Sequence, residues 1–235
     1  MCMYFRKNQL VINLKKGKTE SMIFGTSQKL SKWGKELNLS FNGTEIIQTD
    51  HYKYLGTVLD TTLSLKDNFD TVCKRSMSKL CILLSLSKYL TNVAKVKVYK
   101  GMIMPCLTFN CTVNLNFTNT QEKRLTSLDM LAAKVLGKEQ TQTKNEILKH
   151  AVLLVRKCLD NEACELFHDY FQKMNHNKAT RNNKISLRIP NVRLKFAKSG
   201  FYCLGSSIYN SLPREIRDKD NFKDFRKSIL NFYNK

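Results

Sequence analysis

Few residues in this sequence have the types and spacing that enzyme chemistry requires. Cys158, Cys164 and His168 could contribute to a zinc site, because Cys164 and His168 are one helical turn apart. The spacing matches no zinc finger or knuckle and a fourth ligand is missing, so we interpret Cys158 as an apolar core residue. No Ser/His/Asp or Cys/His nucleophile arrangement and no glycine-rich phosphate loop is present. The sequence therefore predicts no metal site and no cofactor.

Positive charge is the dominant chemical feature. The chain has 40 Lys and Arg residues against 19 Asp and Glu residues, a formal net charge of +21. Such an excess favours a polyanionic partner, either nucleic acid or an acidic membrane face. Asp67 and Asp70 are the only acidic residues between Lys66 and Lys100. The basic side chains of this stretch are candidate phosphate contacts, with a solvated helix face as the alternative: Lys66, Lys74, Arg75, Lys79, Lys88, Lys95, Lys97 and Lys100.

Targeting signals are lacking. No run approaches the ~18–20 apolar residues of a membrane span, and the first seven residues do not have the basic-then-apolar order of a signal peptide. The eight cysteines form no CxxC pair and are typical of reduced thiols. We expect an intracellular protein, in the nucleus or the cytoplasm, that is not secreted and has no membrane partner.

The first sixty residues have the patterns of β-strands. Residues 10–12 and 19–25 flank a basic turn and predict strand, turn, strand. Residues 37–41 and 44–47 flank Asn42-Gly43, a strong type I′ turn signal. Residues 52–60 predict a further hairpin with Gly56 at or near its bend.

Helical periodicity begins at Ser64, which forms a potential capping box with Asp67 and opens a helix of about 24 residues. Three more helices are predicted: residues 92–104 ended by Pro105, residues 118–136 ended by Gly137, and a long helix from Thr143 through Tyr170. Residues 170–214 contain nine basic residues and no acidic residue, and they are interpreted as a basic linker or loosely packed segment. Phe222, Phe225, Ile229 and Phe232 have helical spacing, so we expect a terminal helix that docks back.

Three segments, in this order, resemble the downstream part of a non-LTR retrotransposon reverse transcriptase, an RNA-directed DNA polymerase of mobile elements. The first is Leu10-Val11-Ile12-Asn13-Leu14 with Lys18-Thr19-Glu20-Ser21-Met22-Ile23-Phe24-Gly25. The second is Lys53-Tyr54-Leu55-Gly56-Thr57-Val58-Leu59-Asp60, and the third is Ile208-Tyr209-Asn210-Ser211-Leu212-Pro213-Arg214-Glu215-Ile216-Arg217 followed by Phe222 to Phe225. Together they span nearly the whole chain.

The resemblance implies roles for several residues. Lys18 is similar to the family lysine that acts as a general acid toward pyrophosphate, with a solvated turn lysine beside Lys15 and Lys16 as the simpler interpretation. Tyr54, Leu55 and Gly56 resemble the primer grip, a hairpin whose backbone contacts the primer strand; they could also pack as an ordinary hairpin. The basic helices resemble the polymerase thumb, which faces the template–primer duplex.

We therefore expect an α+β fold: a small antiparallel β remnant of a palm, then a mainly helical thumb-like bundle and a C-terminal helix. The predicted domains are residues 1–62, the palm remnant with the primer-grip-like hairpin; residues 63–175, the thumb-like domain; and residues 176–235, the basic linker and C-terminal helical segment.

The sequence departs from the family where catalysis occurs. Two-metal phosphoryl transfer needs clustered carboxylates, and no two acidic residues are adjacent in this chain. Magnesium would bind only if an upstream palm were present. We expect a truncated polymerase without activity of its own that binds RNA or DNA duplex or hybrid without sequence preference. The alternative is an inert relic or an interaction module whose partner is the missing fingers and palm.

Overall fold

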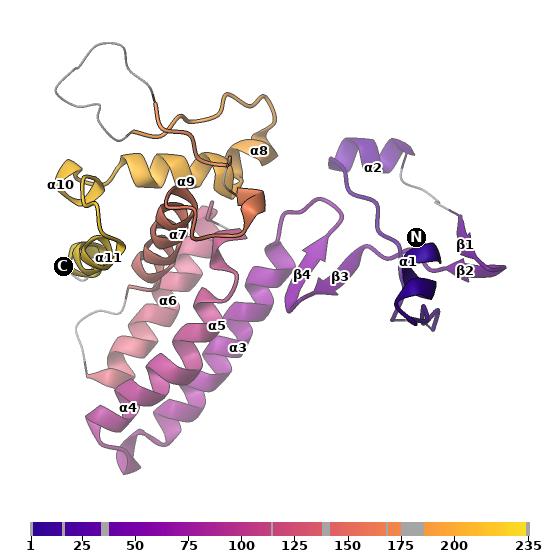
Figure 1. The fold of residues 1–235 in the computed structure, drawn as a ribbon. Coiled ribbons are helices and arrows are strands. Elements are labelled where there is room, and N and C mark those ends of the chain that lie inside the picture. The colour runs from indigo at the N-terminus through magenta and orange to yellow at the C-terminus, as the bar shows by residue number, and fades with distance from the viewer. Residues whose placement is uncertain are drawn as a thin grey trace. The chain divides into compact units, whose positions relative to one another are not determined.

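The computed structural model describes residues 2–15, 17–33, 38–113, 115–137, 142–167, 169–174 and 186–233. It confirms the α+β class: strands occur near the N-terminus and helices make up most of the remainder (Figure 1). The chain divides into two compact units, Met1–Thr71 and Val72–Lys235, with the boundary inside helix α3 (Lys66–Ser85). The three-part division made from the sequence stays a prediction.

Unit 1 contains two short helices and two antiparallel hairpins. The helices are α1 (Cys2–Lys7) and α2 (Ser27–Trp33), and the strands are β1 (Leu39–Phe41), β2 (Thr44–Ile46), β3 (His51–Tyr54) and β4 (Thr57–Asp60). β1 pairs with β2 and β3 with β4. Asn42 and Gly43 have φ angles of 50° and 77°, the left-handed conformations of a type I′ turn between β1 and β2. The strand pairing confirms both predicted hairpins.

The strand–turn–strand predicted for residues 10–25 is wrong. In the described part of this segment, only Ser21 makes a bridge, to Gln48. Val11 is 92% exposed, and none of the apolar residues described in this segment is fully buried, so a strand here would have no core-facing side. The Thr19 hydroxyl donates to the Asn13 carbonyl at 2.8 Å instead. Such local side-chain bonds compete with ladder pairing.

Unit 2 begins within α3, which has 20 residues and a length of about 30 Å. After the 3₁₀ turn η1 (Ser87–Tyr89), the chain returns through α4 (Asn92–Val98), the π-helical turn η2 (Tyr99–Ile103) and α5 (Met104–Thr108), and a 3₁₀ turn, η3 (Cys111–Val113), follows.

Pro105 does not end this helical segment, so that prediction is wrong. The Met104 N–H bonds to the Tyr99 carbonyl, five residues earlier, which is the wider spacing of a π turn. The extra residue removes the steric conflict that a proline ring normally creates with the preceding turn. The segment continues to Thr108, and Phe109 then turns to extended backbone.

Helix α6 (Asn119–Leu136) has the predicted ends. The Thr118 side chain accepts from the Gln121 N–H at 3.3 Å and the Gln121 side chain accepts from the Thr118 N–H at 2.9 Å, so the capping box is complete. Gly137 closes the helix in the left-handed conformation, with φ 63°. The predicted start at Thr118 and the predicted end at Gly137 are therefore confirmed.

Helix α7 (Thr143–Leu159) begins as predicted but ends early, so its continuation to Tyr170 is wrong. Arg156 pairs with Asp160 at 2.7 Å, and Asn161 adopts φ 57°, which turns the chain away from the helix axis. A short 3₁₀ turn, η4 (Glu165–Phe167), follows. Leu166, which continues the apolar spacing in the sequence, is 80% exposed.

The predicted basic linker contains helices, so the linker interpretation is wrong for residues 195–210. They form α8 (Lys195–Ser199) and α9 (Phe201–Asn210). The side chains of Cys203 and Tyr209 are buried, and Tyr209 shares a core cluster with residues of α7. The high basic content of the surrounding residues conceals this short apolar period in the sequence.

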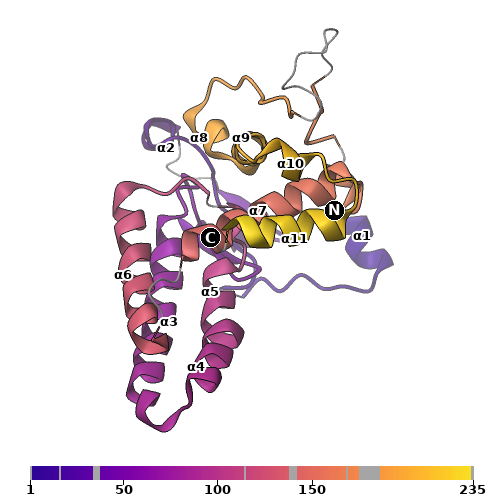
Figure 2. The same ribbon diagram turned by 90° about the vertical axis from the view of Figure 1, so that its left-hand side faces the viewer.

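Two helices complete unit 2: α10 (Arg214–Arg217) and α11 (Phe222–Tyr233). Phe225 and Ile229 are fully buried against Val152 and Val155 of α7, which confirms that the terminal helix docks back. Figure 2 shows α7, α9 and α11 lying beside one another.

Close packing between α7 and α9 depends on Gly205. A Cβ atom at this position would lie 3.0 Å from Val155 Cγ2 and 3.2 Å from ring carbons of Phe171 and Phe201. We expect Gly205→Ala to lower the free energy of unfolding by about 1–3 kcal/mol through overpacking. Urea unfolding followed by circular dichroism measures this change.

The matched control is Gly101→Ala in η2, where an added Cβ meets no atom within 4 Å. We expect this helical substitution to be neutral or to stabilise by up to about 1 kcal/mol. Equal destabilisation by both substitutions would contradict the packing argument.

Candidate nucleic-acid interface

The β3–β4 hairpin displays its bend residues to solvent. Tyr54 is exposed and Leu55 is 75% exposed, so neither side chain is packed in the core. Leu55 has φ 46° and Gly56 has φ 90°. The left-handed conformation costs a leucine roughly 1–2 kcal/mol, whereas Gly56 adopts it freely. A strained, exposed leucine beside an exposed tyrosine is unfavourable for folding alone, and this favours a contact role for the hairpin tip.

Asp60 at the end of β4 fixes the connection from this hairpin to α3. Its buried carboxylate accepts from the N–H groups of Thr62 at 3.0 Å, Ser64 at 3.0 Å and Leu65 at 2.8 Å. It also accepts from the Thr62 and Ser64 hydroxyls at 2.5 and 3.2 Å. Burial acts to raise the pKa of Asp60, but these hydrogen bonds outweigh burial and lower it below the usual value.

The capping box predicted for Ser64 and Asp67 is wrong. Leu65 precedes the helix and its carbonyl accepts the first helical bond, from Phe69 N at 3.0 Å. Asp67 instead lies 3.1 Å from His51 Nδ1 of β3. The Ser64 hydroxyl accepts from the Lys66 N–H at 3.4 Å, while Asp60 accepts from the N–H groups of Ser64 and Leu65. Asp60 followed at once by Thr-Thr and then by Ser64 is the sequence signal of such an Asx-type turn.

The basic residues of α3 differ in their surroundings. Lys66 lies in unit 1, and Lys74 and Arg75 lie in unit 2; all three are exposed, and no described carboxylate pairs with them. On the same helix, Cys73, Ser76, Leu80 and Leu83 are buried, at the three- and four-residue spacing of one face. Lys74 and Arg75 therefore project away from the core of unit 2.

Lys79 has a structural position. Its Nζ donates to the Met102 carbonyl at 3.0 Å and contacts Cys106 Sγ at 2.9 Å, which connects α3 to the η2–α5 segment. Its ammonium group would have to leave these partners before it could contact a phosphate. Lys79 therefore contributes its charge to the fold, unlike the exposed Lys74 and Arg75.

The returning helices carry Lys95, Lys97 and Lys100. Lys97 and Lys100 are exposed, and no ion pair joins either to any acidic residue that the structure describes. Lys95 is half-buried, and its Nζ donates to Asn92 Oδ1 at 3.4 Å. Lys88 lies exposed on η1, between α3 and α4.

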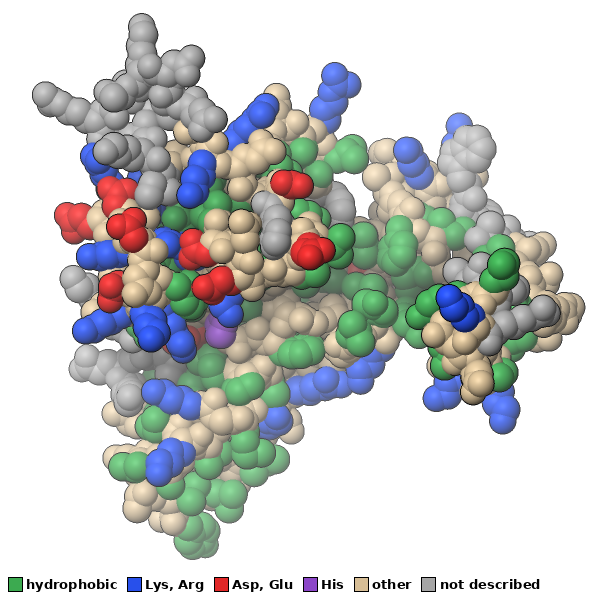
Figure 3. Space-filling model, viewed as in Figure 1, with side chains coloured by type: hydrophobic (Ala, Val, Ile, Leu, Met, Phe, Trp, Pro, Cys, Tyr) green, Lys and Arg blue, Asp and Glu red, His purple; other side chains and the backbone are tan. Residues whose placement is uncertain are grey.

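No acidic residue lies in the sequence from the middle of α3 to the start of α6. Residues 71–121, which we call the acid-free segment, contain seven basic residues and no acidic residue. Figure 3 shows acidic side chains around α10 and α11 and across the neighbouring part of unit 2, whereas the end formed by α4 shows only basic, apolar and uncharged side chains in this view. In this view, the α4 end of unit 2 therefore carries positive charge with no acidic side chain beside it.

The other candidates offer no catalytic arrangement. Lys18 is exposed in a turn, where its N–H bonds to the Lys15 carbonyl at 3.0 Å. Burial raises the pKa of the Cys158 thiol, while Cys164 is exposed and His168 lies outside the described residues. In the part of the chain that the structure covers, no group of three His, Cys, Asp or Glu side chains is placed to hold a metal ion.

Comparisons with known protein families, curated proteins and solved structures find no match to this chain. Within the described ranges, no helix combines the length and the apolar character that crossing a bilayer requires. The binding properties of this surface must therefore be inferred from the residues of this chain.

Asp60 provides a test of how the hairpin is held. Asp60→Ala removes the acceptor of these hydrogen bonds, and we expect it to lower the stability of the hairpin–α3 junction by about 2–3 kcal/mol. Hydrogen exchange of the amides of residues 57–69 in the full chain measures the loss. The control is Asp50→Ala, because Asp50 is an exposed aspartate of the same unit.

This stabilisation has a defined pH dependence. Because the folded pKa of Asp60 is lowered, its contribution is complete above the ordinary carboxyl value of about 3.9 and is lost as pH falls through the folded value. The difference between wild type and Asp60→Ala, corrected for intrinsic exchange, should therefore shrink as the pH is lowered below that ordinary value. A difference that is the same in acid and at neutral pH would show that the carboxylate is not the stabilising group.

Proposed function

We propose that this chain derives from the reverse transcriptase of a non-LTR retrotransposon and that it binds duplex or hybrid nucleic acid without reading its sequence. On this proposal, the hairpin of unit 1 corresponds to a primer grip and the helices that begin with α3 correspond to a thumb. The ordered resemblance of three sequence segments supports the ancestry.

The observation that carries the binding proposal is the set of unpaired, exposed cations in the acid-free segment. Lys74, Arg75, Lys97 and Lys100 have no carboxylate partner among the described residues. A solvated helix face normally mixes charges of both signs. A one-sign surface instead attracts phosphates, which release condensed counterions when lysine and arginine bind them.

The hairpin of unit 1 adds a second kind of contact. Exposed Tyr54 and Leu55 at a strained bend can lie against a sugar–phosphate backbone or a base face. Such contacts position a strand and carry no sequence information. Binding that depends on phosphates and on nonspecific surface contact should therefore be sequence-independent.

Nucleotide addition is not part of the proposal. Two-metal phosphoryl transfer needs carboxylates that clamp the attacking and leaving oxygens, and the adjacent Asp-Asp pair of the resembled family does not occur in this sequence. Lys18 could act as a general acid only beside such a centre. We propose that the chain retains duplex binding and lacks nucleotide addition.

Salt dependence tests the binding proposal. Six phosphate contacts would give a slope of about −5 for the logarithm of affinity against the logarithm of salt concentration. Lys74→Ala/Arg75→Ala should reduce the slope to about −3, because each lost contact removes about one unit. Fluorescence anisotropy with a labelled RNA–DNA hybrid measures both slopes.

The chain offers a matched control for that variant. Arg226→Ala/Lys227→Ala removes an adjacent, exposed Arg–Lys pair of the same composition from α11, and it should leave the slope near −5. Affinity that does not change with salt, or equal slopes for the two double variants, would contradict the proposed surface.

Polymerase activity is expected to be absent. The purified chain, supplied with a primed template, magnesium and labelled nucleotides, should incorporate no label above a protein-free reaction, while a complete reverse transcriptase in the same mixture does. Incorporation that co-purifies with the chain and disappears in Lys18→Ala would refute the proposal that catalysis is missing.

A further inference from the structure

The turn that joins α3 to α4 exposes large apolar side chains. Tyr89 is 74% exposed and Val93 is 66% exposed, and Ile82 and Leu86 are also exposed. Figures 1 and 2 both place this turn at the end of unit 2 opposite α9. This exposure does not contribute to the stability of the fold, because apolar side chains stabilise a protein when they are buried.

Three of these side chains form one stripe. The Leu86 N–H bonds to the Ile82 carbonyl at 3.1 Å, and the Tyr89 N–H bonds to the Leu86 carbonyl at 3.0 Å, so helical geometry continues from α3 through η1. Spacings of four and three residues place Ile82, Leu86 and Tyr89 on the same side of this helical stretch.

The turn is held by its own hydrogen bonds. Leu90 adopts extended backbone, and the Thr91 side chain caps α4 by accepting from the Ala94 N–H at 3.3 Å. The stripe therefore stands on a short capped turn between two helices. A turn fixed in this way presents its side chains at little conformational cost when a partner binds.

Positive charge accompanies the stripe. Lys88 Nζ lies 4.9 Å from the centre of the Tyr89 ring. The turn belongs to the acid-free segment, so no sequence neighbour from residue 71 to 121 offsets this charge. Charge complementarity therefore identifies the partner as an anion that also offers an apolar or aromatic surface.

We propose that this turn is a wedge that contacts unpaired bases, so that the chain prefers junctions between duplex and single strand to fully paired duplex. Tyr89 stacks on an exposed base, Ile82 and Leu86 cover its edge, and Lys88 lies near the adjoining phosphate. Aromatic and aliphatic side chains beside cations make such contacts in other nucleic-acid binders. The inference rests on the proposed function and adds the feature of the nucleic acid that is recognised.

Other partners fit the turn less well. A stable protein interface buries about 800 Å² on each partner, which is more than four side chains on one turn can supply. An interfacial membrane helix lays an apolar face along the bilayer surface. Helix α3, which carries Ile82, instead buries Cys73, Leu80 and Leu83 in the protein core. Nucleic acid needs only a small wedge, because phosphate contacts elsewhere supply most of the affinity.

The experiment compares two probes with the full chain: a blunt RNA–DNA hybrid, and the same hybrid with an unpaired fork carrying 2-aminopurine at the junction. We expect wild type to bind the forked probe about tenfold more tightly, the value of one stacked base. Tyr89→Ala should abolish this preference and leave affinity for the blunt hybrid unchanged. Tyr89→Phe should retain it.

The control is Phe109→Ala, which removes another exposed aromatic side chain of the acid-free segment and should keep the preference. Because Tyr89 is exposed, circular dichroism should show the same folded content in its variants. The 2-aminopurine fluorescence should change when wild type binds and not when Tyr89→Ala binds.

The outcomes separate the two proposals. Equal affinity of wild type for both probes, with the steep salt dependence intact, overturns the wedge and leaves the proposed function standing. Binding to neither probe overturns both. Binding to vesicles of anionic phospholipid that Tyr89→Ala abolishes, without a preference for the fork, identifies the turn as a membrane contact and also overturns the wedge.

Discussion

A buried guanidinium holds the C-terminal part of unit 2 together. Arg156 of α7 is only 7% exposed, and its Nε bonds to Asp160 at 2.7 Å. Its two terminal nitrogens donate to the carbonyls of Lys219 at 2.6 Å and Asp220 at 2.7 Å, and its carbon lies 5.1 Å from the centre of the Phe225 ring. A buried charge destabilises a fold unless its donors are paired, so the turn before α11 is restricted to the position that satisfies Arg156.

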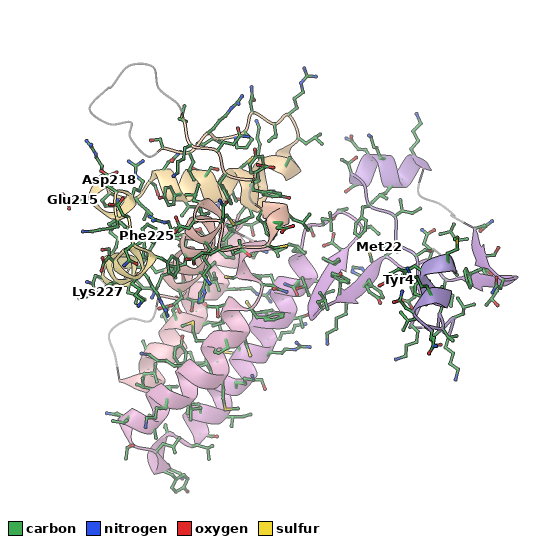
Figure 4. All side chains as sticks on the ribbon, in the orientation of Figure 1. Tyr4, Met22, Glu215, Asp218, Phe225 and Lys227 are labelled. Carbon is green, nitrogen blue, oxygen red and sulfur yellow. The ribbon has the colours of Figure 1, made fainter. Side chains whose placement is uncertain are left out.

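The third segment of the resemblance serves this same framework. The Asn210 side chain accepts from the Leu187 N–H and donates to the Leu187 carbonyl, both at 2.8 Å, and so replaces a neighbouring strand. Arg217 donates to the Leu212 carbonyl at 3.1 Å. Glu215, Asp218 and Lys227 lie on the outside of the same region (Figure 4). These residues explain the segment as a means of closing the C-terminal core rather than as a contact for nucleic acid.

The predictable parts of this molecule are those that a few neighbouring residues decide. Asn42-Gly43 specifies its turn and Thr118 with Gln121 specifies its cap, because each motif satisfies its own backbone groups. Pro105 is different, because the π turn that precedes it allows the helical segment to continue past the proline. For the candidate site, sequence locates the cations but not their partners. Lys79 resembles its neighbours in sequence, yet only the fold shows that it is bound to Met102 and Cys106.

Exposed aromatic turns occur in both units, and the same tripeptide forms each. Lys53-Tyr54-Leu55 lies at the bend of β3–β4, and Lys88-Tyr89-Leu90 lies at the turn between α3 and α4. One is a strained β bend and the other a 3₁₀ turn, so a shared backbone geometry cannot explain the shared residues. What the two turns have in common is an exposed tyrosine next to an exposed lysine, the pair that base stacking and phosphate attraction require. A common chemical demand on two different backbones favours contact with one class of partner, and a polyanion with aromatic faces satisfies that demand.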